Sequence, residues 1–126
     1  MKILLIMLLA ALQPAATSKG ESPFVCNIGA LTAADRARKE EISRSLRELI
    51  MNVRELPDGF EFQFRPEANT LPLLGEWTWS ERLCCPFFDF VVRVEREGGR
   101  IALRLTGRPG TKEFIRADLG KWMKRN

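Results

Sequence analysis

Three short segments in which apolar and polar residues alternate limit what this chain can fold into. They cover residues 60–65, 88–95 and 101–106, and a pair of glycines separates the last two. Because successive side chains of a strand point to opposite faces of a sheet, this period of two predicts strands with one buried face. The sequence therefore predicts an antiparallel sheet, built from a strand near 60–65 and a hairpin over 87–106.

The first of these segments also predicts which side of the sheet is buried. Phe60, Phe62 and Phe64 fall on one face, whereas Glu61 and Gln63 fall on the other. We expect the phenylalanines to face a core and the polar side chains to face water. An acidic residue at position 63 should then cost little stability.

Three amphipathic segments predict helices that cover this sheet. Each begins with a threonine that can cap a helix, at Thr32, Thr70 and Thr111. Apolar residues then recur at helical spacing, in three sets: Ile42, Leu46, Leu49, Ile50 and Val53; Leu73, Trp77 and Cys84; and Phe114, Ile115, Leu119 and Trp122. The order of these elements predicts a two-layer α+β fold with three helices mainly on one face of the sheet.

Charged residues of both signs fill the rest of the first predicted helix, Lys39 among them. Because these charges alternate in sign, they predict a solvated face rather than a basic binding surface. Pro86 is expected to end the second helix, since proline cannot continue one.

The first 18 residues have the composition of a secretory signal peptide. Lys2 precedes an uninterrupted apolar run over 3–12, and small residues at Ala16 and Ser18 fit the positions that a signal peptidase reads. This run is shorter than the roughly 20 residues that a transmembrane helix needs. We expect cleavage near Ser18, with Ala16 as the alternative last residue removed. A single domain over 19–126, exported to the periplasm or the medium and without a transmembrane anchor, would remain.

The chain of 126 residues contains no histidine. This excludes catalysis by Ser-His-Asp or Cys-His groups and any histidine metal ligand. The net charge is +4, but acidic residues lie among the basic ones, and together with export this argues against nucleic acid as a partner. Special chemistry must therefore come from thiols and carboxylates.

The three cysteines, Cys26, Cys84 and Cys85, carry the candidate chemistry. The vicinal pair falls in the last turn of the second predicted helix, and Glu81 lies three and four positions before it, which places its carboxylate beside both sulfurs. Adjacent helical residues point about 100° apart. We therefore expect one thiol of the pair to join Trp77 in the core and the other to reach the rim.

Three interpretations of these cysteines stay open. A disulfide from Cys26 to one of the vicinal pair suits an exported protein and would stabilise it by about 4 kcal/mol. A soft metal ion, such as mercury(II), arsenic(III) or copper(I), prefers sulfur and would be held by Cys26, Cys84 and Cys85 with Glu81. Structural zinc fits less well, because it requires four ligands and the chain has three cysteines and no histidine. A thiol-dependent enzyme would use Cys85 as nucleophile and Glu81 as general base, without the histidine that usually assists.

A resemblance bears on this choice. The block that carries it reads Glu81-Arg82-Leu83-Cys84-Cys85-Pro86-Phe87-Phe88-Asp89-Phe90, followed after the hairpin by residues 105–114. It resembles a group of small uncharacterised bacterial domains, and the likeness extends from Cys26 to about Leu119. Some relatives resemble proteins found with, or fused to, mercury-responsive regulators. The resemblance implies thiol binding of a soft metal.

We therefore expect an exported binding protein rather than an enzyme. Its expected ligand is a soft metal ion of the mercury or arsenic class, held by Cys26, Cys84, Cys85 and Glu81. The alternative is a disulfide-stabilised interaction module of the bacterial envelope, which would bind an envelope protein and no metal.

Overall fold

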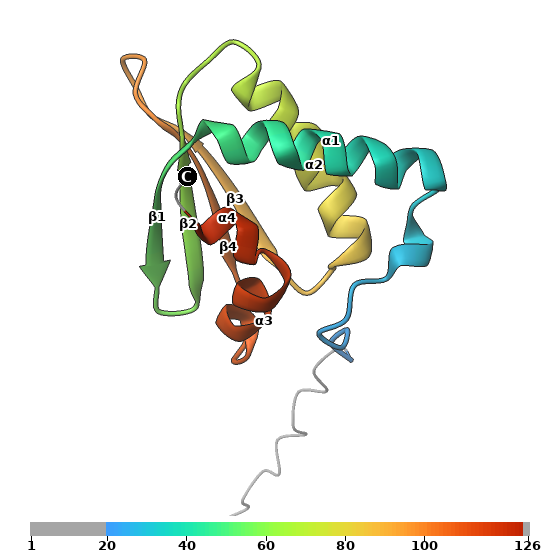
Figure 1. The fold of residues 1–126 in the computed structure, drawn as a ribbon. Helices are drawn as coiled ribbons and strands as arrows, with labels where there is room; N and C mark the ends of the chain where they lie inside the picture. Colours follow the sequence, from blue (N-terminus) through green and yellow to red (C-terminus); the bar gives the residue numbers. More distant parts are fainter. Residues whose placement is uncertain (1–19, 125–126) are drawn as a thin grey trace, which may run out of the picture.

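The computed structural model describes residues 20–124, so the predicted signal peptide lies outside the described residues. A four-stranded antiparallel sheet forms one layer of the molecule (Figure 1). Its strands are β1 (Ile50–Leu56), β2 (Gly59–Phe64), β3 (Asp89–Val94) and β4 (Ile101–Thr106), in the spatial order β1-β2-β4-β3. Both central strands, β2 and β4, are buried along most of their length.

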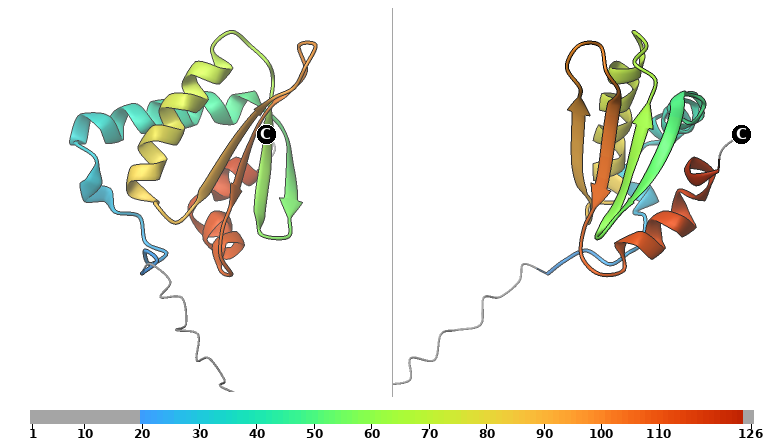
Figure 2. Two further views of the ribbon diagram at one scale, coloured as in Figure 1. Left: turned by 180° about the vertical axis from the view of Figure 1, so that it is seen from behind. Right: turned by 90° about the vertical axis from the view of Figure 1, so that its left-hand side faces the viewer.

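Helices form the second layer and gather on one face of the sheet (Figure 2). They are the 3-10 helix η1 (Ile28–Ala30) and the α-helices α1 (Ala33–Leu49), α2 (Thr70–Cys84), α3 (Thr111–Asp118) and α4 (Gly120–Met123). The predicted two-layer α+β fold is thus confirmed. Across residues 20–124, no helix has both the length and the apolar character needed to cross a membrane.

Strand β1 was not predicted. The spacing of Ile50 and Val53 continued the apolar stripe of the first helix, but α1 ends at Leu49 and these residues enter the sheet. The turn after Leu56 folds this segment back onto β2, where Val53 lies opposite Phe62. Pairing with β2 provides hydrogen bonds for the backbone of β1, and the β-branched side chains of Ile50 and Val53 favour a strand. This tertiary pairing overrides the helical spacing.

The polar face of β2 is buried, contrary to the expectation that it faces water. Glu61 is 4% exposed and Gln63 is 6% exposed. The guanidinium groups of Arg54 and Arg104, from the strands on either side, donate to Glu61 at 3.1 and 2.9 Å, and Gln63 also accepts from Arg100 at 2.7 Å. Burial raises the pKa of Glu61, but hydrogen bonds from Gln63 and the two arginines outweigh it and lower that pKa to about 2. An acidic residue at position 63 is therefore not expected to be harmless.

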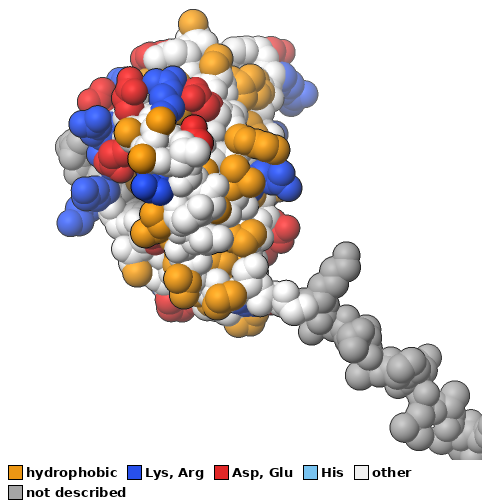
Figure 3. Space-filling model, turned by 90° about the vertical axis from the view of Figure 1, so that its right-hand side faces the viewer, with side chains coloured by type: hydrophobic (Ala, Val, Ile, Leu, Met, Phe, Trp, Pro, Cys, Tyr) orange, Lys and Arg blue, Asp and Glu red, His pale blue; other side chains and the backbone are white. Residues whose placement is uncertain are grey.

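The outer strand β3 is more exposed than its alternating pattern predicts. Val92 and Val94, expected on the buried face of the hairpin, are exposed. Because β3 lies at the edge of the sheet, it packs against one neighbouring strand only. Trp79 and Leu83 are also exposed, and the surface in Figure 3 shows hydrophobic side chains lying among basic and acidic ones.

The predicted threonine caps are only partly correct. The Thr32 hydroxyl accepts from the backbone N–H of Asp35 at 3.1 Å, which confirms the predicted start of α1. Thr70 and Thr111, in contrast, are fully buried, and each donates its hydroxyl at 2.6 Å to a carbonyl of the loop before its helix. Each of these two hydroxyls therefore binds the start of its helix to the preceding loop.

Trp122 connects the two layers at the centre of the core. The predicted last helix is broken at Leu119 into α3 and α4, and this break turns Trp122 inward. Its ring lies 5.4 Å from Phe62, 6.2 Å from Phe64 and 4.7 Å from Trp77, measured between ring centroids. The C-terminal helices are thereby held against α2, next to the end that carries the vicinal cysteines.

Replacing Phe62 with aspartate should prevent folding, because the carboxylate would enter a fully buried position without a partner. The penalty of several kcal/mol is comparable with the roughly 5 to 15 kcal/mol that holds such a domain folded. Val91→Asp is the matched control, since Val91 is 51% exposed and lies opposite Arg104 across β3 and β4. Circular dichroism melting should show no cooperative transition for Phe62→Asp and a near-parental one for Val91→Asp. Cooperative melting of both variants would contradict the assigned core face.

Candidate thiol and metal site

The end of α2 positions the vicinal cysteines. Cys84 is the last residue of the helix, and Cys85 caps it by donating its backbone N–H to the Glu81 carbonyl at 2.7 Å. The proline at position 86 turns the chain away from the helix, as predicted. Because Cys85 has already left helical geometry, its side chain turns inward. Both thiols are consequently buried, at 3% and 0% exposure, and the expectation of one thiol at the rim is wrong.

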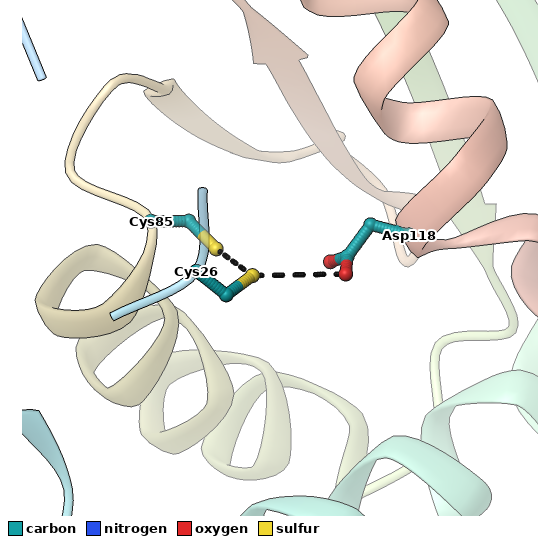
Figure 4. Close-up of side chains that lie close together, drawn as sticks. All are labelled: Cys26, Cys85 and Asp118. Atoms are coloured by element: carbon teal, nitrogen blue, oxygen red, sulfur yellow. Dashed lines mark hydrogen bonds between the residues drawn. The ribbon is translucent and has the colours of Figure 1, made fainter. Parts of the chain in front are cut away.

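The N-terminal segment brings the third cysteine to the same place. The backbone N–H of Asn27 donates to the Cys84 carbonyl at 2.7 Å, which fastens this segment to the end of α2. The Cys26 sulfur then lies 2.8 Å from the Cys85 sulfur and 3.6 Å from a carboxylate oxygen of Asp118. Figure 4 shows Cys26 between Cys85 on one side and Asp118, from the end of α3, on the other. No disulfide joins the described cysteines.

All four predicted site residues thus lie together. The sulfurs of Cys85 and Cys84 are 3.9 Å apart, and the Cys84 sulfur lies 3.8 Å from Oε2 of Glu81. Two sulfurs that bind one ion at about 2.3 Å with tetrahedral angles are about 3.8 Å apart. The 3.9 Å separation within the vicinal pair is close to this spacing, so the pair needs little rearrangement to share an ion at such bond lengths and angles.

Two sets of potential ligands overlap at Cys85. One consists of Glu81, Cys84 and Cys85, and the other of Cys26, Cys85 and Asp118. Within each set the ligand atoms lie within 4.8 Å of one another. Asp118 was not predicted, because it lies 92 positions from Cys26 and only the packing of α3 brings it near.

Lys39 is the second site residue that the sequence analysis missed. Its ammonium lies 2.5 Å from Oε2 of Glu81 and 3.2 Å from the Cys84 sulfur. Lys39 was assigned to the solvated face of α1, yet it lies three and seven positions before Ile42 and Leu46, which are buried. This spacing places Lys39 on the same face of the helix as Ile42 and Leu46, so the sequence alone contained the signal for its burial.

The carboxylate of Glu81 is fully buried, and within the described residues its Oε1 has no hydrogen-bond partner. A buried carboxylate oxygen normally has a partner, because an unpaired one loses its hydration without compensation. The Lys39 ammonium balances the charge through Oε2 alone. One oxygen therefore remains able to bind a cation or a hydrogen-bond donor.

The three thiols differ in acidity. The hydrogen bond donated by Cys85 lowers the pKa of Cys84 to about 7, against the effects of burial and of Glu81 and with help from Lys39. The same hydrogen bond, together with burial, raises the pKa of Cys85. Burial raises the pKa of Cys26 to about 11. Cys84 is therefore the most acidic of the three thiols, and the thiolate is the form that binds metals and attacks electrophiles.

The chain matches no family model, and comparisons with curated proteins and with solved structures find no match. The resemblance to small bacterial domains, on the block that contains the vicinal pair, therefore stays a prediction. The case for function rests on the geometry of the site.

Replacing Lys39 with methionine should lower the free energy of unfolding by about 3 kcal/mol, because it leaves the carboxylate of Glu81 buried without its cation. The double variant Lys39→Met/Glu81→Gln removes both charges and should recover most of that loss. Urea denaturation measures both changes. Equal stability of the two variants would show that the pair is not electrostatically coupled.

Proposed function

We propose that this protein binds a soft metal ion through the thiolates of Cys84 and Cys85, with Cys26 as a third ligand. The observation that supports this best is the gathering of three sulfurs from two distant parts of the chain around the buried end of α2. Mercury(II), arsenic(III) and copper(I) are the matching ions, because they accept two or three sulfur ligands without imidazole. Structural zinc needs four ligands and is a poorer match.

The charges around the site support thiolate binding. Ionising three thiols beside Glu81 would gather negative charge in a buried place, and the Lys39 ammonium, 3.2 Å from the Cys84 sulfur, offsets part of it. A bound soft cation offsets a further part, which is larger for arsenic(III) than for mercury(II) or copper(I). The free Oε1 of Glu81 offers an additional oxygen at the same end of the cluster.

Binding one ion through all three sulfurs requires Cys26 to move, because Cys26 and Cys84 belong to different sets of ligand atoms and share only Cys85. Cys26 and Cys85 are 2.8 Å apart, which is about 1 Å closer than two sulfurs bound to one ion. Cys26 is only half-buried and belongs to the segment before η1, so it is the ligand that would move away from Cys85 and toward Cys84. Cys84 and Cys85 therefore supply the preformed part of the proposed site.

The proposal includes export. Removal of residues 1–18 would leave a protein that acts outside the cytoplasm as a binding protein, and the composition of these residues supports this step. Such a protein would bind soft ions in the periplasm or the medium.

Addition of arsenic(III) or mercury(II) to the reduced domain should raise its melting temperature. Binding to the folded state alone stabilises it by about 2.7 kcal/mol at a free ion concentration a hundredfold above Kd. For a domain of this size, each kcal/mol corresponds to roughly 4 to 8 °C, so the expected rise is about 10 °C or more. Differential scanning calorimetry measures the shift. Mercury also binds thiols of the unfolded chain, so arsenic(III) gives the clearer result.

Serine variants separate the ligands. Cys84→Ser/Cys85→Ser should abolish the rise, whereas Cys26→Ser should only reduce it, because the preformed sulfur pair remains. Zinc should give a smaller rise than arsenic(III). An unchanged melting temperature of fully reduced protein with both soft ions would rule out the proposed function.

A disulfide-stabilised envelope module is the second candidate, and the close approach of Cys26 and Cys85 favours it. Their sulfurs are 2.8 Å apart, whereas a disulfide bond is about 2.05 Å long, so a small shift would allow oxidation. The bond would close a loop between residues 59 positions apart, which in the chain-entropy model stabilises the fold by about 4 kcal/mol.

The full chain, expressed in a bacterium and recovered from the periplasm, distinguishes the two candidates. Its intact mass should lack residues 1–18, and alkylation should count three free thiols if the metal site is the native state. One free thiol, at Cys84, would indicate the Cys26–Cys85 bond and support the module instead. Retention of the first 18 residues in the recovered chain would contradict the proposed export.

A further inference from the structure

Cys26 and Cys84 lie on the wall of a cavity of about 690 Å³. The cavity is bounded by η1, α1, α2 and the two C-terminal helices, and Trp77 and Trp122 contribute to its lining. A bare metal ion occupies a small fraction of this volume. Its size is instead that of a pocket for a small organic molecule, within the usual range of about 300 to 1,000 Å³.

The lining of this cavity carries an excess of positive charge. Its basic residues are Arg36, Lys39, Arg47, Arg116, Lys121 and Lys124, against the acidic residues Glu40, Glu81 and Asp118. A free divalent cation that enters would be repelled by this excess, whereas an anionic molecule would be attracted. The cavity and the thiols thus favour ligands of opposite charge.

Some of these cations already have partners. Lys39 pairs with Glu81, Arg116 pairs with Glu55, and Arg36 donates to backbone carbonyls. Arg47 and Lys121, in contrast, have no side-chain hydrogen bond or ion pair within residues 20–124. Their charges are free to bind an anionic group that occupies the cavity.

We infer that the soft metal reaches this site as a complex with an anionic, carboxylate-bearing small thiol, which occupies the cavity while its metal passes to the protein. This inference rests on the proposed function and names the form of its ligand. Such a complex suits both the basic cavity and the thiols. Its carboxylates would face Arg47 and Lys121, and its metal would face Cys84 and Cys26. A metal bound to two such thiols carries a net negative charge, unlike the free ion.

The transfer is a ligand exchange at the metal, without oxidation or reduction. The Cys84 thiolate forms a bond to the metal, and one metal–sulfur bond to a carrier thiol breaks, so that this thiol leaves as a thiolate. A second protein thiol, from Cys85 or Cys26, then displaces the second carrier thiol in the same way. The proton that the second protein thiol loses passes to a departing carrier thiolate.

Two mercury(II) complexes of matched size test this inference. One contains two 3-mercaptopropionate ligands, which carry carboxylates, and the other contains two 3-mercaptopropionamide ligands, which are neutral. Rates of transfer to the reduced protein are followed by stopped-flow quenching of tryptophan fluorescence, and mass spectrometry of the product verifies the bound metal. At low salt the anionic complex should transfer at least about tenfold faster, and this ratio should fall toward one at about 0.5 M salt.

Paired variants show whether the cavity itself provides the preference. Arg47→Gln/Lys121→Gln removes two lining cations that have no ion-pair partner within residues 20–124, and it should reduce the rate ratio at least about threefold. Arg44→Gln/Arg93→Gln removes the same net charge from exposed positions outside the cavity and should leave the ratio unchanged. All four residues lie outside the proposed ligand set, so the final amount of bound metal should be the same in both variants.

The outcomes separate this inference from the proposed function. Equal rates from both complexes at low salt, with metal bound in the end, would overturn the inference and leave the soft-metal site standing. An equal loss of preference in both paired variants would also overturn it, because net charge rather than the cavity would be responsible. Transfer from neither complex would overturn this inference, and the response of the melting temperature to the free ions would then decide whether the proposed function stands.

Discussion

The buried ion pair between Lys39 and Glu81 is the interaction on which the arrangement of the site depends. A carboxylate at full burial needs a cation, and α1 supplies it 2.5 Å away. The pair therefore holds the middle of α1 against the last turns of α2, where the vicinal cysteines begin. Hydrophobic residues of similar volume often pack as stably as a buried ion pair, so the pair contributes more to the arrangement of the site than to the stability of the fold.

The ammonium of Lys39 also affects the acidity of the Cys84 thiol. Lys39 lies 3.2 Å from the Cys84 sulfur, and Cys85 donates a hydrogen bond to that sulfur from the other side. Together they lower the pKa of Cys84 to about 7 in a place where burial opposes ionisation. A buried thiolate of this kind suits a soft cation, which replaces lost hydration with strong bonds to sulfur.

Around this centre, the N-terminal segment and α3 supply the parts that α2 does not contain. The bond from Asn27 to the Cys84 carbonyl brings Cys26 to the site, and Trp122 holds the C-terminal helices close enough for Asp118 to reach it. The vicinal pair lies at the buried end of α2, whereas Cys26 belongs to a segment that is less buried. This difference underlies both proposed states of Cys26, as a third metal ligand and as a disulfide partner.

The periodicity of the sequence predicted most of the fold, because alternation and helical spacing report which face of an element is buried. It predicted β2, the β3–β4 hairpin, α2 and the grouping of Glu81 with the vicinal cysteines, since residues three and four apart on a helix share a face. It did not predict β1, where helical spacing and pairing with β2 compete and the pairing prevails. Local patterns contain no information on which of the two the chain adopts.

Tertiary structure decided the remaining features of the site. Whether Lys39 faces water or Glu81 depends on how α1 packs against α2, and whether Glu61 is buried depends on arginines from two other strands. Cys26 and Asp118 meet across 92 positions of chain, a contact that no spacing along the sequence encodes. The sequence by itself thus determined the residue types and local faces available to the site, and packing of distant segments determined distances, burial and charge, because these depend on neighbours that only the folded chain supplies.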